Sequence, residues 1–266
     1  MACDGHMRVT VLGSRGSVPV CGSDFSVFGG NTSCYLVEAG DERIFLDAGS
    51  GLVNAPVRFS RAPVILLSHP HVDHLLGLGM YERISQPGTM TKLYVPARDA
   101  QEAQAVIERL YSPPLWPLGL DGYAGDLQIE AMPKAMRIGE AAVETERGSH
   151  PGGSQLIKIC HAGKVLVYAT DFEHGEKASA RLAQFSRDAD LLLYDGQYGE
   201  GEYGAHRGFG HSTLEEGVAL MDRAGVKKMM VVHHDPHSTD KVLLARERKL
   251  GRTDIWFARE GAVIEL

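Results

Sequence analysis

The sequence predicts an α/β protein in which two β-sheets pack face to face and helices cover the outside. Short β-branched runs bounded by Gly, Asp and Pro dominate the first third, and helices alternate with strands in the last third. The expected strands also clearly outnumber the helices. No repeat, low-complexity segment or linker interrupts residues 1–266, so we expect a single domain. For residues 1–6, a cloning remnant before a native start at Met7 and a disordered N-terminus both stay open.

Apolar runs bounded by turn residues predict the strands of the first two thirds. The last two strands should form a hairpin that turns at Ala162-Gly163. The predicted strands are Arg8–Leu12, Ser33–Glu38, Arg43–Leu46, Pro63–Leu67, Lys92–Pro96, Leu127–Met132, Ala135–Ile138, Ala142–Glu146, Gln155–Cys160 and Lys164–Tyr168.

A helix is expected over Asp99–Ser112, where apolar residues recur with helical spacing. Pro113–Asp126, which contains three prolines and three glycines, should form an irregular loop and is a candidate lid. Ser212 and Glu215 predict a capping box at the start of a later helix. The predicted elements of the last third are helices Lys177–Arg187, Thr213–Ala224 and Lys241–Leu250, and strands Asp190–Tyr194, Lys228–Val232, Asp254–Ala258 and Ala262–Leu266.

Composition and charge exclude several classes of protein. The chain is 44% hydrophobic, and no stretch approaches the ~18 apolar residues that span a bilayer. Met1–Arg15 lacks an apolar run of secretory-signal length, so we expect a cytoplasmic protein. Lys and Arg number 27 against 34 Asp and Glu, a net charge of −7, which argues against binding a long nucleic acid. The four scattered cysteines predict neither a disulfide framework nor a thiolate zinc site.

The strongest functional signal is a cluster of histidines directly after the predicted strand Pro63–Leu67. His69, His71, Asp73 and His74 lie within six positions. Neutral imidazole and carboxylate groups suit Zn²⁺, Mn²⁺ or Fe²⁺. On an extended segment His69 and His71 point the same way, and Asp73 and His74 follow a turn and can face a second ion. The alternative interpretation is a solvated polar loop.

Four further residues of ligand type stand at strand ends or in turns. Asp47 closes Arg43–Leu46, and it is either a structural turn residue or a carboxylate that orients a ligand histidine. His150, Asp171 and His233, taken singly, can each be a satisfied loop residue. Taken together they supply what two ions would still lack, namely a third neutral ligand on each side and a bridging carboxylate.

This order of residues resembles the five-motif ligand set of the metallo-β-lactamase-fold hydrolases, and it spans nearly the whole chain. The resemblance implies the αββα four-layer sandwich of that family. Gly210-His211-Ser212-Thr213, followed by an amphipathic helix, resembles the phosphodiesterase branch. That branch includes ribonuclease Z and the cyclic ribose phosphodiesterase associated with carbon–phosphorus lyase. His211 also has a second interpretation, as a residue that only precedes a helix cap.

The resemblance implies two divalent metal ions, with Zn²⁺ favoured over Mn²⁺ or Fe²⁺, and a role for each motif residue. Asp171 would bridge the ions, Asp47 would orient a ligand histidine, and His234, the alternative to His233, would lie just outside the ligands. Homodimerisation is a further expectation from the resemblance. The terminal ligands implied are His69, His71 and His150 for one ion, and Asp73, His74 and His233 for the other.

On this interpretation a hydroxide that bridges the two ions attacks phosphorus. The catalytic residues are His211, as proton donor or as charge partner of the phosphoryl oxygens, and Asp73, which is also a ligand. Backbone N–H groups near Gly153 and Ser154 are candidates for binding an anionic substrate. Arg15 and Asn31 are either structural turn residues or further pocket residues.

Differences between this sequence and the families it resembles limit the classes of substrate that it could act on. Ribonuclease Z carries a long arm that grips transfer RNA, often inserted between the third and fourth motifs, whereas only twenty residues separate His150 from Asp171. The carbon–phosphorus-lyase relative has a cysteine-rich zinc loop near its start, where this chain has only Cys21. We therefore expect a phosphodiesterase for a small or cyclic phosphodiester such as a cyclic nucleotide. The alternatives are a carbonyl hydrolase (lactonase, thioesterase or β-lactamase), a ribonuclease Z-like RNA hydrolase, and a non-hydrolytic di-iron or binding protein.

Overall fold

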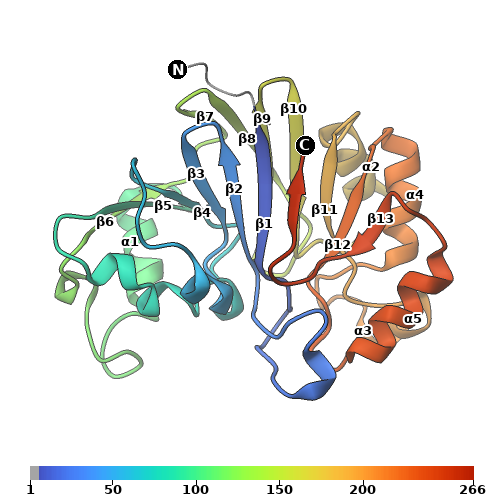
Figure 1. The fold of residues 1–266 in the computed structure, drawn as a ribbon, viewed down its shortest axis with the longest axis horizontal. Coiled ribbons are helices and arrows are strands. Elements are labelled where there is room, and N and C mark those ends of the chain that lie inside the picture. Colours follow the sequence, from blue (N-terminus) through green and yellow to red (C-terminus); the bar gives the residue numbers. More distant parts are fainter. Residues whose placement is uncertain (1–5) are drawn as a thin grey trace.

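The computed structural model describes residues 6–266, and the expectations for residues 1–5 lie outside this range. Over the described residues the chain forms two seven-stranded sheets that face each other (Figure 1). The first sheet has the order β14-β1-β2-β3-β4-β5-β6, and β3 to β6 run parallel. Its strands are β1 (Met7–Gly13), β2 (Cys34–Ala39), β3 (Glu42–Leu46), β4 (Val64–Leu66), β5 (Met90–Val95), β6 (Asp126–Ala131) and β14 (Val263–Glu265).

The second sheet has the order β13-β12-β11-β10-β9-β8-β7, and β10 to β13 run parallel. The predicted hairpin is its antiparallel β9–β10 pair. Its strands are β7 (Ala135–Ile138), β8 (Ala141–Arg147), β9 (Gln155–His161), β10 (Lys164–Ala169), β11 (Leu191–Asp195), β12 (Met229–Val232) and β13 (Ile255–Phe257).

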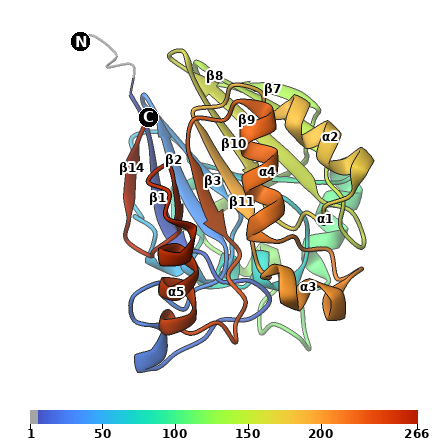
Figure 2. The same cartoon turned by 90° about the vertical axis from the view of Figure 1, so that its right-hand side faces the viewer.

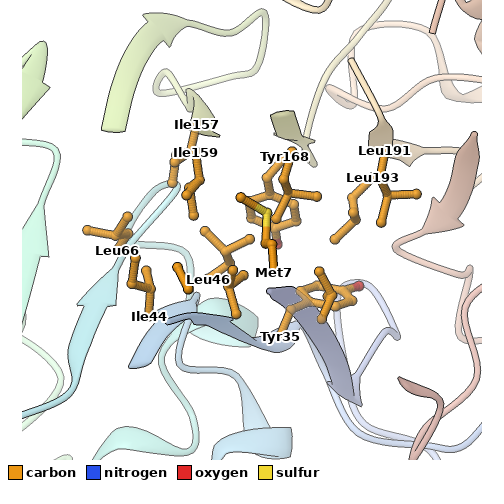
Figure 3. Close-up of a cluster of buried hydrophobic side chains, with 14 of the residues drawn as sticks. Met7, Tyr35, Ile44, Leu46, Leu66, Ile157, Ile159, Tyr168, Leu191 and Leu193 are labelled. Carbon is orange, nitrogen blue, oxygen red and sulfur yellow. The ribbon is translucent and has the colours of Figure 1, made fainter. Parts of the chain in front are cut away.

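The alternation of side chains along the strands explains why the sheets stack. In β10, Leu166 and Tyr168 face the other sheet, whereas Val167 and Ala169 face the helices. Figure 3 shows the layer between the sheets, where Leu46 and Tyr35 of the first sheet meet Tyr168 of the second. Because both faces of these central strands are apolar, each sheet must be covered on both sides.

Helices provide the two outer layers (Figures 1 and 2). Residues of α1 pack against β6 and share an apolar cluster with β3, β4 and β5, and residues of α2, α4 and α5 pack against β10 to β13. The predicted αββα sandwich is therefore confirmed. Within residues 6–266, no helix combines the length and apolar character that crossing a bilayer requires. The helices are α1 (Ala100–Glu108), α2 (Glu176–Phe185), α3 (Glu200–His206), α4 (Leu214–Ala224) and α5 (Asp240–Leu250).

Most predicted elements occur within a few residues of the expected bounds, with two corrections. Helix α3 was not expected, because its segment contains two glycines and no apolar stripe. The cap of α4 lies one residue later than predicted, since the side chain of Thr213 accepts the N–H of Glu216. Ser212 instead has its Oγ 2.7 Å from the hydroxyl of Tyr194 and 3.0 Å from Nδ1 of His174. The capping-box prediction for Ser212 and Glu215 is therefore wrong.

The loop between α1 and β6 is irregular, as predicted, but it is held to the body of the protein. The indole N–H of Trp116 donates to the hydroxyl of Tyr123, 2.7 Å away, which donates to the carbonyl of Gly79 at 3.0 Å. The role of this loop as a lid stays a prediction.

Arg15 is buried and joins three segments of the chain through hydrogen bonds, which fits the structural interpretation of this residue. Its guanidinium donates to the carbonyls of Gly29 at 2.8 Å, Ser238 at 2.7 Å and Asp235 at 3.2 Å. It therefore ties the end of β1 to the loop that follows β12. Asn31 has a comparable role, because its side chain donates to Glu260 at 3.0 Å.

Replacing Arg15 should destabilise the fold far more than replacing an exposed arginine. Arg15→Met leaves three carbonyls without their charged donor, which should cost about 3 kcal/mol or more. Arg8, whose partner is Glu38 at the surface, is the control, and Arg8→Met should cost less than about 1 kcal/mol. Urea unfolding followed by circular dichroism measures both. An equal loss in the free energy of unfolding for the two variants would contradict this structural role of Arg15.

Candidate metal centre

The parallel strands bring distant residues to one edge of the sandwich. Asp47 follows β3, His69 lies shortly after β4, Asp171 follows β10 and His233 follows β12, so all four stand at carboxyl ends of strands. The structure gathers all seven predicted ligands into two groups, and within each group the donor atoms lie within 4.8 Å of one another. One group is His69, His71, His150 and Asp171, and the other is Asp73, His74 and His233.

Hydrogen bonds outside the cluster fix the orientation of four of these imidazoles. Nδ1 of His74 lies 2.7 Å from Asp47, Nδ1 of His150 lies 2.9 Å from the carbonyl of Gly210, and Nδ1 of His233 lies 2.8 Å from Oε1 of Gln197. Nδ1 of His69 lies 3.1 Å from the hydroxyl of Ser68, whose own proton goes to Asp47. Because Nδ1 has a partner outside the cluster in each case, Nε2 is the nitrogen that faces the cluster.

His71 is oriented differently. Its Nδ1 lies 3.1 Å from Nε2 of His150. Two nitrogens bound to one tetrahedral Zn²⁺ at ~2.1 Å would lie about 3.4 Å apart, so this spacing suits a shared ion.

Asp171 faces both groups, with a different oxygen toward each. Its Oδ1 lies 3.6 Å from Nε2 of His69 and 3.7 Å from Nε2 of His150. Its Oδ2 lies 3.1 Å from Nε2 of His74 and 3.3 Å from Nε2 of His233. Asp73 belongs to one group only, since its Oδ2 lies 3.2 Å from Nε2 of His74 and 3.3 Å from Nε2 of His233.

The electrostatics of the cluster favour positive charge. Burial alone would raise the pKa values of Asp73 and Asp171, but the neighbouring histidines hold both pKa values well below their usual range. Burial lowers the pKa of His74 and His233, yet the surrounding carboxylates outweigh it and raise the pKa of His233 to about 9 and that of His74 as well. His69 and His150 behave oppositely, because burial dominates and lowers their pKa. A cation could replace the protons held by His74 and His233.

The buried nitrogen atoms of the cluster test whether its side chains suit a metal ion. Nε2 of His69 and Nε2 of His74 are both buried without a hydrogen-bond partner, although carboxylate oxygens lie nearby. A buried polar atom without a partner is costly and calls for an explanation. Lone pairs that face one another beside two ionised carboxylates form a donor set suited to divalent metal ions such as Zn²⁺. The residues present therefore fit the metal ions that the fold implies.

Asp47 binds the Nδ1 atom of His74, as expected for a carboxylate that orients a ligand histidine. It is fully buried and accepts hydrogen bonds from the N–H and hydroxyl of Ser68, from His74 and from the hydroxyl of Tyr168, at 2.6–2.8 Å. It also has a positive φ of 62°, and Asp171 and His233 have φ values of 50° and 60°. Such backbone geometry is rare outside glycine and concentrates at functional sites.

His211 lies at the rim of the cluster and is paired with a residue that the sequence interpretation missed. Its Nδ1 lies 2.8 Å from Oδ2 of Asp195, and its ring stacks on that of His233 with centroids 4.8 Å apart. With Asp171 and His233 it forms a third group that could hold a metal ion. The signal for Asp195 was available, because it ends the apolar strand β11 just as Asp171 follows β10.

His234 is turned away from the cluster. Its Nε2 donates to the carbonyl of Ala258 at 2.8 Å, and its ring packs against Phe28 and Phe257. Burial lowers the pKa of His234 to about 3, so it is a neutral interior residue. It therefore supports no ligand directly, in contrast to the expectation of a residue just outside the ligands.

The residues suggested for substrate binding have mainly local partners. The N–H of Gly153 donates to the carbonyl of His150 at 2.9 Å, and the hydroxyl of Ser154 donates to the carbonyl of Asp171 at 2.9 Å. The N–H of Gly153 is therefore not available to an anion, which corrects that expectation. Both residues nevertheless line a cavity of about 430 Å³ that also borders Pro70, Arg98 and Arg147.

Comparisons with known proteins identify the family. A family model described as "Beta-lactamase superfamily domain" matches residues 42–234. The ribonuclease Z of Halorubrum lacusprofundi is 26% identical, and the match covers 85% of this chain and 86% of that protein. The probable metallo-hydrolase YhfI of Bacillus subtilis is 22% identical over 97% of this chain and all of its own length.

Solved structures agree on the fold. The metallo-β-lactamase-fold protein YhfI has a TM-score of 0.75, with 21% identity over 98% of this chain and 100% of that chain. A structure described as a new diphosphatase from the PhnP family has a TM-score of 0.72, with 18% identity over 98% of both chains. Because the family model covers most of the chain, including the histidine cluster, this protein belongs to the β-lactamase superfamily domain family and is a hydrolase of the metallo-β-lactamase fold.

Proposed function

We propose that the protein is a phosphodiesterase that uses two divalent metal ions to hydrolyse a small or cyclic phosphodiester. The observation that carries this proposal is the position of Asp171, whose two carboxylate oxygens face different groups of histidines. A carboxylate with that placement suits a bridge between two neighbouring ions. His69, His71 and His150 would hold one ion, and Asp73, His74 and His233 would hold the other.

The ions, when bound, would polarise the phosphoryl group and lower the pKa of a water molecule to supply the nucleophile. The protein must then supply a proton to the leaving alkoxide, which departs poorly unless it is protonated. His211 is the candidate donor, because Asp195 binds its Nδ1 and leaves Nε2 to carry a second proton. The contact with Asp195 also fixes the orientation of the His211 ring.

Two features favour a small substrate. The segment between His150 and Asp171 is taken up by the β9–β10 hairpin and leaves no room there for an RNA-gripping arm. The net charge of −7 also disfavours contact with many phosphates. Cyclic nucleotides are the leading class, because a diester of this size needs only the cluster and its rim.

A ribonuclease Z-like RNA hydrolase is the second candidate. It is favoured by one observation, namely that several curated relatives at 22–26% identity carry the name ribonuclease Z. The two candidates share the metal centre and differ in what surrounds it, so substrate tests separate them.

Metal analysis should find about two transition-metal ions per chain. His150→Ala and His74→Ala should each reduce the content by about one ion, because each removes a ligand from a different group, and Asp171→Ala should reduce both. His237→Ala is the control, since that exposed histidine lies outside both groups. Elemental analysis of purified protein measures the content. A wild-type content that stays at zero after incubation with Zn²⁺ or Mn²⁺ would refute the metal centre.

His211→Ala should keep its metal ions and lose turnover according to the leaving group. With 2′,3′- or 3′,5′-cyclic AMP, whose ribose alkoxide needs a proton, we expect a loss of about 10²–10⁴-fold. With bis(p-nitrophenyl) phosphate, whose leaving group needs no proton, the loss should be much smaller. Asp195→Asn should follow the same pattern. Loss of a metal ion from His211→Ala would instead make His211 a ligand.

A substrate panel should separate the two candidate functions. We expect hydrolysis of cyclic mononucleotides and dinucleotides and no cleavage of precursor transfer RNA, because the net charge of −7 disfavours contact with many phosphates. Steady-state rates on both substrate types, each with added Zn²⁺ and Mn²⁺, measure the preference. Efficient cleavage of precursor transfer RNA with inert cyclic nucleotides would favour the second candidate.

A further inference from the structure

Glu173 lies two residues beyond Asp171 and binds the turn Gly208–Gly210, which packs against the predicted ligand His150. Its carboxylate accepts hydrogen bonds from the hydroxyl of Tyr203 at 2.9 Å, the N–H of Gly208 at 2.6 Å and the N–H of Gly210 at 3.1 Å. One half-buried carboxylate therefore ties the end of β10 to the segment between α3 and α4.

The turn that Glu173 holds determines the position of two residues of the site. The carbonyl of Gly210 accepts the proton of Nδ1 of His150 at 2.9 Å, and His211 is the next residue along the chain. Gly208 and Gly210 have φ values of +87° and +93°. A Cβ atom at Gly210 would lie 2.1 Å from Nδ1 of His150, so the turn packs directly against that imidazole.

We propose that Glu173 is a positioning residue, which fixes the Gly208–Gly210 turn and thereby orients His150 toward its metal ion and His211 toward the leaving group. This inference rests on the function proposed above. Glu173 does not belong to any of the groups that could hold a metal ion, so its effect must pass through the turn.

The chemistry of the carboxylate explains why a glutamate is needed here. Oε1 accepts two donors and Oε2 accepts one, so both oxygens act only as acceptors. A glutamine would place an N–H₂ group against an N–H of Gly208 or Gly210, and one of these bonds would be lost. Glu173→Gln therefore disturbs the turn while the volume of the side chain is kept.

The first test is metal affinity, which does not depend on turnover. Zn²⁺ binding to wild type and Glu173→Gln is measured by competition with a chromogenic chelator. Because the partner that orients His150 is displaced, we expect one of the two sites, the one formed by His69, His71, His150 and Asp171, to lose about 10–100-fold in affinity.

The second test is the dependence of turnover on the leaving group, measured on protein saturated with Zn²⁺. On cyclic AMP, kcat of Glu173→Gln should fall about 10–100-fold with little change in KM, because the proton donor is misplaced. On bis(p-nitrophenyl) phosphate the fall should be much smaller, as for His211→Ala. A purely structural role would reduce both rates equally.

Two control variants isolate the turn. Tyr203→Phe removes a donor of the same carboxylate that lies outside the turn, and it should keep near wild-type affinity and kcat. Glu247→Gln alters a carboxylate that accepts the N–H of Phe257 and the guanidinium of Arg259 away from the cluster. This variant should lose stability without a difference between the two substrates.

The outcomes separate this inference from the proposed function. If the wild type binds no metal or hydrolyses no phosphodiester, the proposed function fails. If the wild type does both and Glu173→Gln keeps its metal affinity and loses both activities equally, or loses neither, the positioning role of Glu173 is wrong.

Discussion

The buried carboxylate of Asp47 connects the two sheets and the cluster of histidines. It has four donors, which come from Ser68 and His74 beyond β4 and from Tyr168 of β10 in the opposite sheet. A charge buried this deeply is tolerated only when hydrogen bonds replace its hydration. The sheets must therefore pack in one register for Asp47 to be satisfied, and that same register places the Nε2 atom of His74 opposite Asp171. The hydrogen bonds of Asp47 therefore constrain the packing of the core and the geometry of the cluster together.

The backbone reflects the same constraint. Asp47, Asp171 and His233 all have positive φ angles just after a parallel strand, in a region that costs non-glycine residues of order 1–3 kcal/mol each. Each strand supplies a rigid support for the site residue that follows it, whereas the next residues after Asp47 and Asp171, Ala48 and Phe172, pack in the outer apolar layers. The free energy stored there is offset by the large apolar layer shown in Figure 3, of which Leu46 and Tyr168 are part.

Much of this architecture could be predicted from the sequence because the signals are local. Apolar runs bounded by turn residues predicted the strands, and the spacing of His69, His71, Asp73 and His74 predicted the cluster. Asp195 and Glu173 were missed because their partners, His211 and the turn at Gly208–Gly210, are brought to them only by the tertiary fold. Helix α3 was missed because its glycines carry no helical periodicity. The expectation for Gly153 failed because a sequence does not show that a backbone N–H already has an acceptor.

The pairing of β1 with β14 has a consequence for how the protein is made. Val9 lies opposite Ile264, so β1 acquires its outer neighbour, β14, only after the other strands of both sheets have been synthesised. Until Val263–Glu265 leave the ribosome, one side of β1 presents unpaired peptide groups to other chains. The outer edge of β1 therefore stays open until β14 has been synthesised, and a nascent chain stalled before β14 exposes an unpaired strand edge that favours aggregation.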